Sequence, residues 1–339
     1  MASSEQGANP VLVEVWRGPA VESVHRGAWV LADGSGAVLD GAGDWDTPIF
    51  PRSAIKALQA LPLLESGAAG RYAFDDADVA LACASHNGEP CHTERAAAIL
   101  ARLDLGPGAL QCGAHPPGDP ATDAALRARG ERPSALHNNC SGKHAGFLAL
   151  ARQLAAPVER YLDVESPGQR AVRRAVGEMT GVDPAQLEFG IDGCSAPNWR
   201  MPLKGLATAF ARLAEPGGLA PERAAACRRL ADSVARNPVL IAGSHKRICT
   251  DLVRETAGRL FPKIGAEAVY VVGVRGADRG LALKLDDGGK RGLHPLLLAL
   301  LGRLGLASAA ELARLAGYRE AVLSNYAGLE IGRVEVRLA

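Results

Sequence analysis

The sequence has few aromatic residues, almost no net charge and no long apolar run. Aromatic side chains make up 4% of its 339 residues. Lysine and arginine (38) nearly balance aspartate and glutamate (37), so no strong positive field attracts nucleic acid or an acidic membrane surface. No apolar run reaches the roughly 20 residues that span a bilayer, and the first ten residues lack the pattern of a secretion signal. We therefore expect a cytoplasmic protein with neither nucleic-acid nor membrane partners.

The cysteines lack the spacing of a disulfide framework, and no Cys-x-x-Cys motif is present. Their number is odd, and they are scattered along the chain at Cys83, Cys91, Cys112, Cys140, Cys194, Cys227 and Cys249. This distribution favours reduced thiols over structural disulfides. Metal binding by some of them is the more specific alternative.

Strand patterns lie near both ends of the chain and enclose a helical middle. Alternating or continuous apolar residues predict strands at residues 11–15, 28–32, 37–39, 268–274 and 281–285. Helical spacing predicts helices at residues 53–60, 93–103, 119–129, 141–154, 169–179, 203–213, 221–235 and 296–304. We predict an α+β fold in which helices flank an antiparallel sheet. Residues 1–339 are expected to form a single domain whose helical middle covers about 93–260.

A serine and a lysine stand one helical turn apart at the start of the helix predicted for residues 53–60. In this Ser-x-x-Lys pattern, Ser53 and Lys56 share one face of the helix. A serine hydroxyl needs a base to become a nucleophile, and a lysine can be that base only if its pKa falls well below about 10.4. Short patterns recur by chance, so an exposed serine and lysine remain the simpler interpretation of this pair alone.

Two later segments strengthen the catalytic interpretation. Ser85 begins a Ser-x-Asn pattern after an apolar, strand-like run ending at Ala84, and Lys263 begins Lys-x-Gly just before the strand at 268–274. The order of the three patterns resembles that of penicillin-recognising serine enzymes, although Ile264 replaces their usual serine or threonine. If the patterns converge, repulsion between two lysines keeps one of them neutral.

This convergence predicts an acyl-transfer mechanism with two serine–lysine pairs. Ser53 would attack an amide carbonyl while Lys56 takes its proton. Ser85 and Lys263 would relay a proton to the departing ammonia or activate the water that removes the acyl group. The sequence leaves open which serine is acylated.

A second group of reactive side chains lies on two glycine-containing turns. Cys140, Lys143 and His144 occupy the start of a predicted helix, and Cys194 lies on a distant turn. Two thiolates could bind zinc with nitrogen or water completing a tetrahedron. Two buried reduced cysteines, with Lys143 paired to a carboxylate, are the simpler alternative. A third is a Cys140–His144 nucleophile, which lacks an evident orienting residue.

Taken together, these residues resemble those of one family, the bacterial L-asparaginases of the thermolabile Rhizobium etli type, also grouped as asparaginase II-like proteins. The matching segments are residues 22–27, 52–56, 74–86, 139–144, 192–194 and 263–266. The resemblance extends over nearly the whole chain, and the segment at 139–144 is its most specific part. Two segments depart from the family pattern, at residues 87–90 and 195–197, and these departures bear on substrate preference rather than on reaction type.

The resemblance implies an amidohydrolase that converts L-asparagine to L-aspartate and ammonia. It also implies a fold like that of serine β-lactamases and penicillin-binding proteins, and a homodimer. The catalytic residues would be Ser53, Lys56, Ser85 and Lys263, and zinc beside the substrate would be bound by Cys140, Lys143 and Cys194. By the same resemblance, Asp192 would bind the substrate ammonium and Arg52 its carboxylate, while His86 and His144 would line the pocket. Either histidine could equally be structural.

Two other functions remain compatible with the sequence. A β-lactamase or peptidase-like acyltransferase could use the same serine–lysine groups, although Ile264 and the lack of a secretion signal argue against it. A zinc-containing amino-acid sensor could bind asparagine without turning it over. Release of ammonia from asparagine separates these classes.

Overall fold

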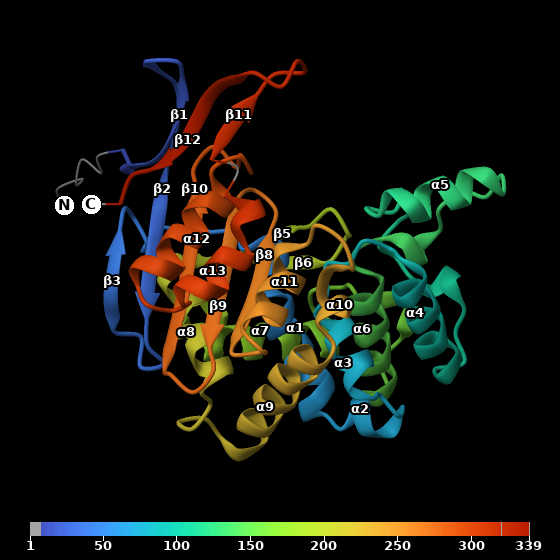
Figure 1. Ribbon diagram of the computed structural model, residues 1–339. Helices are drawn as coiled ribbons and strands as arrows, with labels where there is room; N and C mark the ends of the chain where they lie inside the picture. The colour runs from blue at the N-terminus through green and yellow to red at the C-terminus, as the bar shows by residue number, and fades with distance from the viewer. Residues whose placement is uncertain (1–7, 320, 339) are drawn as a thin grey trace.

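The first and last parts of the chain build one antiparallel sheet together (Figure 1). A computed structural model describes residues 8–319 and 321–338. The sheet has eight strands, ordered β11-β12-β1-β2-β10-β9-β8, with β3 also pairing with β2. These strands are β1 (Val11–Arg17), β2 (Ala20–Ala32), β3 (Val38–Ala42), β8 (Leu260–Gly265), β9 (Val269–Val274), β10 (Arg279–Leu285), β11 (Val322–Ser324) and β12 (Glu330–Val336).

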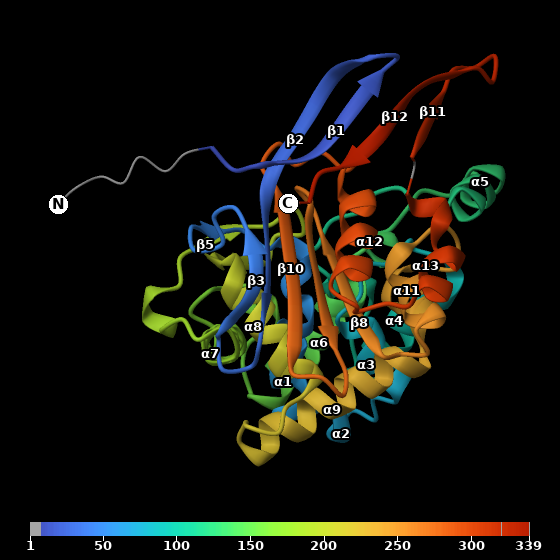
Figure 2. The ribbon, with the colours of Figure 1, turned by 60° about the vertical axis from the view of Figure 1, so that its left-hand side comes forward.

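The long strand β2 belongs to two parts of this sheet. Its residues 20–26 pair with β1, whereas residues 27–32 pair with β10. Figure 2 shows β1, the start of β2, β11 and β12 projecting beyond the helices, and we call these four segments the arm. Strand β2 therefore connects the arm to the main body of the sheet.

Helices and short strands fill the region between the terminal strands. The helices are α1 (Lys56–Glu65), α2 (Ala68–Arg71), α3 (Asp76–Ala82), α4 (Pro90–Arg102), α5 (Pro120–Ala128), α6 (Ser141–Gln153), α7 (Pro167–Thr180), α8 (Leu203–Ala214), α9 (Pro221–Arg236), α10 (Pro238–Ala242), α11 (Ile248–Glu255), α12 (Leu293–Arg303) and α13 (Ala309–Arg314). Two further pairs of short strands are β4 (Pro48–Ile49) with β7 (Met201–Pro202), and β5 (Phe189–Ile191) with β6 (Pro197–Trp199). Within residues 8–319 and 321–338, no helix is both long and apolar enough to cross a membrane.

Helices cover both faces of the body of the sheet. On one face, Gly280 of β10 and Gly273 of β9 lie against the backbone of α8, so closely that a Cβ atom at either position would overlap it. Leu285 projects from the opposite face of β10 and contacts Gly292, at the start of α12. The predicted α+β class, with helices flanking an antiparallel sheet, is confirmed.

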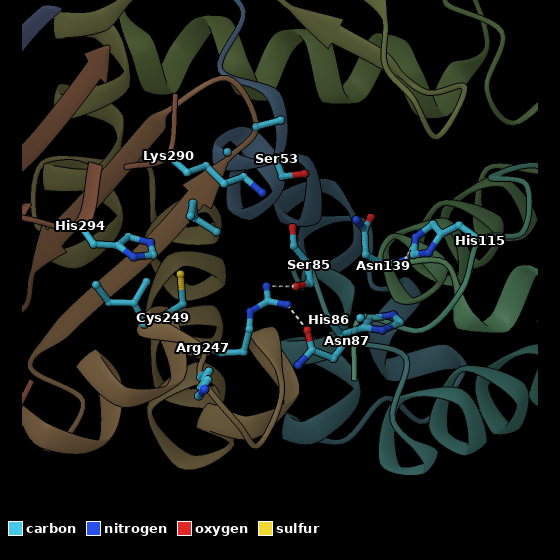
Figure 3. Close-up of a pocket in the computed structure, with 16 residues that line it drawn as sticks. Ser53, Ser85, His86, Asn87, His115, Asn139, Arg247, Cys249, Lys290 and His294 are labelled. Carbon is cyan, nitrogen blue, oxygen red and sulfur yellow. Dashed lines mark hydrogen bonds between the residues drawn. The ribbon is translucent and has the colours of Figure 1, made fainter. Parts of the chain in front are cut away.

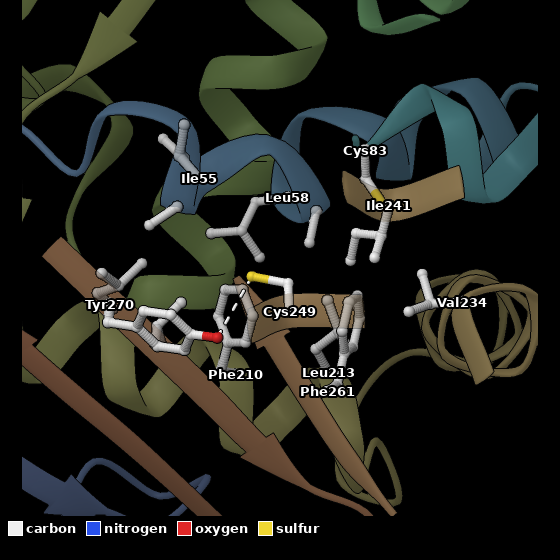
Figure 4. Close-up of a cluster of buried hydrophobic side chains, with 14 of the residues drawn as sticks. Ile55, Leu58, Cys83, Phe210, Leu213, Val234, Ile241, Cys249, Phe261 and Tyr270 are labelled. Atoms are coloured by element: carbon white, nitrogen blue, oxygen red, sulfur yellow. Dashed lines mark hydrogen bonds between the residues drawn. The ribbon is translucent and has the colours of Figure 1, made fainter. Parts of the chain in front are cut away.

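A hydrophobic core joins the sheet to the helical region (Figure 4). Phe210 of α8 packs against Phe261 of β8 with ring centroids 5.7 Å apart. Leu58 of α1 is completely buried in the same cluster. Burial of a side chain of this size contributes about 1.5–3 kcal/mol, so this cluster fixes α1 against the strand that carries Lys263.

Most predicted elements overlap helices or strands of the structure, but the segment before Ser85 was predicted wrongly. The strand-like run ending at Ala84 forms helix α3. Asp75 accepts a hydrogen bond from the backbone of Asp78, whose side chain accepts one from the backbone of Asp75. This capping box starts a helix that the apolar run alone does not distinguish from a buried strand. Strands β8, β11 and β12 were not predicted, and the division into a single domain stays a prediction.

Candidate active site

A close approach between two backbones brings the Ser-x-x-Lys and Lys-x-Gly patterns together. Ser53 lies in a short 3-10 helix, Arg52–Ile55, which leads into α1 and packs against β8. A Cβ atom on Gly265 would overlap the carbonyl oxygen of Pro51, so the glycine of the Lys-x-Gly pattern permits this packing. Arg52 has a φ of 51°, in the left-handed region. Such backbone strain in a residue other than glycine is concentrated at functional sites.

Ser85 and Lys263 form a direct hydrogen bond in a buried position. Lys263 Nζ donates to Ser85 Oγ at 2.9 Å and to the carbonyl oxygen of Ile264 at 3.0 Å. Only 1% of Lys263 and 7% of Ser85 are exposed. Burial, together with the nearby charge of Lys56, lowers the pKa of Lys263 to about 7. A lysine with this pKa is substantially neutral at neutral pH and can accept a proton.

Lys56 is also buried, but its amine is bonded to the backbone. Its Nζ donates to the carbonyl oxygen of Ala84 at 2.6 Å and to that of Asn139 at 3.2 Å. These two bonds tie α1 to the segments that carry Ser85 and Cys140. In this arrangement Lys56 supplies a fixed positive charge beside Lys263.

Ser53 and Ser85 line the same cavity, which has a volume of about 390 Å³ (Figure 3). This volume is typical of a small-molecule site. Within residues 8–319 and 321–338, Ser53 Oγ has no hydrogen-bond partner, so its hydroxyl is available to a ligand. The cavity is lined by Ser53, Ser85, His86, Asn87, His115, Gly118, Asn139, Lys246, Arg247, Ile248, Cys249, Ile264, Gly265, Ala266, Lys290 and His294. Its charged lining is basic, which suits a ligand that carries a carboxylate.

Arg52 and Asp192 bind each other in a second cavity of about 480 Å³. Arg52 donates to one oxygen of Asp192 from Nε at 3.0 Å and from Nη2 at 2.8 Å. Burial alone would raise the pKa of Asp192, but its hydrogen bond to Arg52 contributes to a net lowering. Consecutive residues line the two cavities, because Ala266 borders the first and Glu267 the second.

His86 borders the first cavity, but both of its ring nitrogens are bonded within the protein. Nδ1 accepts from the backbone of Gly88 at 3.1 Å, and Nε2 lies 3.0 Å from Ser141 Oγ. The ring also stacks on His92, with centroids 4.7 Å apart. Burial lowers the pKa of His86 well below its ordinary value. These contacts hold His86 in place and so help to orient the adjacent Ser85. Contact between His86 and the substrate stays a prediction.

The structure brings the two predicted thiol ligands and Lys143 together. Lys143 Nζ donates to Cys194 Sγ at 3.0 Å. A hydrogen bond from Cys194 lowers the pKa of Cys140 well below its ordinary value. Burial opposes charge on Lys143, but the charges of Cys140 and Cys194 outweigh it and raise the pKa of Lys143. All three side chains are buried.

The residues of this cluster fit a zinc ion by their chemistry. Thiolate sulfur and histidine nitrogen are ordinary zinc ligands, whereas Lys143, whose pKa is raised by the neighbouring thiols, would have to lose its proton to bind the ion. His144 lies beside the cluster, where its Nδ1 is 2.7 Å from the hydroxyl of Tyr161. Its buried Nε2 has no hydrogen-bond partner in the described part of the chain. A buried polar atom without a partner is uncommon, and here it stands next to the Cys194 thiol.

Arg247 is a cavity residue that the sequence analysis did not identify. Its guanidinium donates from Nη2 to the carbonyl oxygen of Ser85 at 2.6 Å and from Nη1 to Asn87 Oδ1 (Figure 3). Burial lowers its pKa from the ordinary value. In the sequence, Lys246 and Arg247 resemble a basic surface turn, and only the fold reveals that one of them supports Ser85.

A family model described as L-asparaginase II matches residues 13–336. No curated protein matches the chain. The match covers both serine–lysine pairs and the cysteine–lysine cluster.

Several solved structures resemble the chain at low sequence identity. Mglu in the presence of 4.3 M NaCl is 16% identical with a TM-score of 0.45, over 83% of this chain and 61% of that one. Mglu in its glutamate form is 16% identical with a TM-score of 0.45, over 88% and 66%. A β-lactamase from Mycobacterium bovis is 14% identical with a TM-score of 0.41, over 86% and 95%. The chain thus spans about three fifths of the length of the first of these proteins.

Proposed function

The chain belongs to the L-asparaginase II family, and from this membership together with the geometry of the cavity we propose that it hydrolyses L-asparagine to L-aspartate and ammonia. Family membership supports a hydrolase role. The observation that carries the mechanism is the hydrogen bond of 2.9 Å between Lys263 Nζ and Ser85 Oγ. It joins a hydroxyl to a buried amine whose pKa burial lowers to about 7.

In the proposed reaction, Ser53 Oγ attacks the side-chain amide carbon of asparagine, because its hydroxyl is available in the cavity. Its proton passes through Ser85 to the neutral amine of Lys263. The bond between the amide carbon and nitrogen then breaks, and the proton returns along the same path to the departing ammonia. Water repeats the attack on the ester at Ser53, with Lys263 again as the base, and aspartate is released.

Lys56 has an electrostatic role in this proposal. Its charge disfavours a second charge on Lys263, and so keeps the base neutral. The role predicted from sequence, direct removal of the Ser53 proton by Lys56, would require its Nζ to leave the carbonyl oxygens of Ala84 and Asn139. The two possible roles of Lys56 lead to different pH dependences of kcat/KM.

Arg52 and Asp192 are proposed to bind the two charged groups of the amino acid. An arginine–aspartate pair is complementary in charge to a carboxylate and an ammonium, and a guanidinium can bind two carboxylate oxygens at once. Both side chains are only partly exposed, at 28% and 13%. The carboxylate and ammonium of the substrate would replace part of the hydrogen bonding between Arg52 and Asp192.

The proposal includes zinc bound by Cys140, Lys143 and Cys194. When bound, zinc would supply a charged cross-link between the start of α6 and the turn that carries Asp192. The cross-link would hold Asp192 in position for the substrate, and His144 would support Cys194 from the side. The nucleophile and its base belong to other residues.

Ammonia release from purified, folded protein tests the proposed activity. Ammonia formed from millimolar L-asparagine, together with a serine ester trapped by mass spectrometry, is the expected result. Folded protein that binds asparagine but forms no ammonia would indicate the amino-acid sensor instead. Stable labelling by a fluorescent penicillin, without amidase activity, would indicate a β-lactamase-like acyltransferase.

The homodimer and the cytoplasmic location stay predictions from the resemblance and the sequence. The β11 strand of the arm and the turn that follows it carry exposed apolar side chains at Val322, Leu329 and Tyr326, which are 56%, 65% and 114% exposed. These residues offer one surface on which a second copy could pack. Light scattering during size-exclusion chromatography measures the number of chains in the particle.

A further inference from the structure

Three side chains with metal-binding atoms meet near the start of α4, away from the cysteine–lysine cluster. Glu89, Cys91 and His92 each present one ligand atom, and these atoms all lie within 4.8 Å of one another. Glu89 and His92 are buried, whereas Cys91 is exposed. The site is therefore fixed on its inner side and open to solvent at the thiol.

The His92 ring is held so that one nitrogen faces the cluster. Its Nε2 lies 3.2 Å from the carbonyl oxygen of Val239 and serves as donor to it. One face of the ring stacks on His86 with an interplanar angle of 8°. Because Nε2 is the donor, the neutral ring has an unprotonated Nδ1, which lies 3.6 Å from Cys91 Sγ. Metal-binding histidines commonly donate their other ring N–H to a carbonyl in this way.

The distance between these two atoms fits tetrahedral coordination. Zinc lies about 2.3 Å from sulfur and about 2.0–2.1 Å from imidazole nitrogen, so a tetrahedral angle separates the two ligand atoms by about 3.6 Å. The separation of Cys91 Sγ from His92 Nδ1 is 3.6 Å without any rearrangement.

Glu89 presents the third potential ligand atom and connects the cluster to the candidate active site. Its Oε1 accepts from the backbone of Ser244 at 2.8 Å and from Asn87 Nδ2 at 3.5 Å. Within the described residues its side-chain hydrogen bonds fall on Oε1, and Oε2 accepts none. The Ser244 loop continues to Arg247, which bonds to the carbonyl oxygen of Ser85.

We propose that Glu89, Cys91 and His92 form a zinc site that stabilises the loop supporting Ser85. Thiolate and imidazole select a transition metal such as zinc over magnesium or calcium. Water completes the tetrahedron from the solvent side, where Cys91 is exposed. The site lies outside the catalytic groups and does not depend on the reaction at Ser53.

Zinc binding by the full-length chain tests this site. Zinc stoichiometry and affinity are measured by competition with a chromophoric chelator for the parent, Cys91→Ser and Glu89→Gln proteins. We expect each substitution to weaken binding of one zinc equivalent by about tenfold or more. Cys140→Ser, which alters the cysteine–lysine cluster, should still bind the zinc ion assigned to Glu89, Cys91 and His92. Cys227→Ala is the control for loss of a thiol outside both clusters.

Thermal unfolding gives a second measurement that is independent of activity. Added zinc should raise the Tm of the parent through this equivalent, and the rise should be smaller for Cys91→Ser. Cys91→Ser should release ammonia like the parent. The proposal would be overturned if folded Cys91→Ser bound zinc with the stoichiometry and affinity of the parent. It would also be overturned if no zinc equivalent in the parent depended on Cys91.

Discussion

Lys263 Nζ contacts Ser85 Oγ at 2.9 Å although 178 residues separate them in the sequence. The contact depends on three elements. Strand β8 carries the lysine, α3 ends just before the serine, and the start of α1 brings Lys56 close to both. Burial makes the contact chemically useful, because it lowers the pKa of the amine to about 7.

Removal of either hydroxyl should nearly abolish turnover. Ser53→Ala removes the proposed nucleophile, and Ser85→Ala breaks the path to Lys263, so we expect kcat to fall by about a hundredfold or more in each. Steady-state ammonia release measures the loss, and unchanged unfolding temperatures show that the variants are folded. Wild-type kcat in either variant would exclude that serine from the mechanism.

The reaction should require the unprotonated form of Lys263. Because the pKa of Lys263 is lowered to about 7, the amine loses its proton as the pH rises through that value. Below it, kcat/KM should fall by about tenfold for each pH unit. Measurement of kcat/KM from about pH 5 to about pH 9 checks this decrease on the acidic side. A limb near the ordinary lysine value of about 10.4 would mean that burial does not activate this amine.

Substitution of Lys56 separates its two possible roles. Lys56→Met keeps much of the side-chain volume but removes the charge that lowers the pKa of Lys263. The acidic limb of the kcat/KM profile should therefore move to higher pH, by about one unit, while activity persists on its alkaline side. If Lys56 takes the Ser53 proton directly, activity is instead lost at every pH.

The packing of β8 against the 3-10 helix should not tolerate a side chain at position 265. Gly265→Ala places a Cβ atom against the carbonyl oxygen of Pro51. We expect a loss of stability of about 1–3 kcal/mol and a fall in kcat as Ser53 and Lys263 move apart. Gly217→Ala is the matched control, because a Cβ atom there meets no atom within 4 Å. Equal stability and activity of the two variants would contradict this role for Gly265.

Loss of the zinc site proposed at the cysteine–lysine cluster should affect substrate binding more than chemistry. Cys140→Ala removes one thiol from the cluster beside Asp192, so we expect a raised KM and a smaller change in kcat. Metal analysis of the purified protein, with steady-state kinetics, measures both effects. An unchanged KM in protein that lacks this zinc equivalent would remove the metal from substrate positioning.

Helical spacing predicts that Ser53 and Lys56 share one face, but it could not show that the Lys56 amine is bonded to the carbonyl oxygens of Ala84 and Asn139. The contact between Ser85 and Lys263 could be proposed only from the order of the motifs, since tertiary packing creates it. The segment before Ser85 was misassigned because a buried apolar run fits a strand as well as a helix. Arg247 was missed because the sequence does not show which surface-like arginine turns inward.

The continuity of β2 has a mechanical consequence. Its residues 20–26 lie in the arm and its residues 27–32 in the body of the sheet, with no break in the strand between them. A torque on the arm must either bend β2 or be transmitted through β10 and β9 to β8, the strand that carries Lys263. A force applied to the arm would therefore act on the sheet that carries the proposed general base, without any contact inside the cavity.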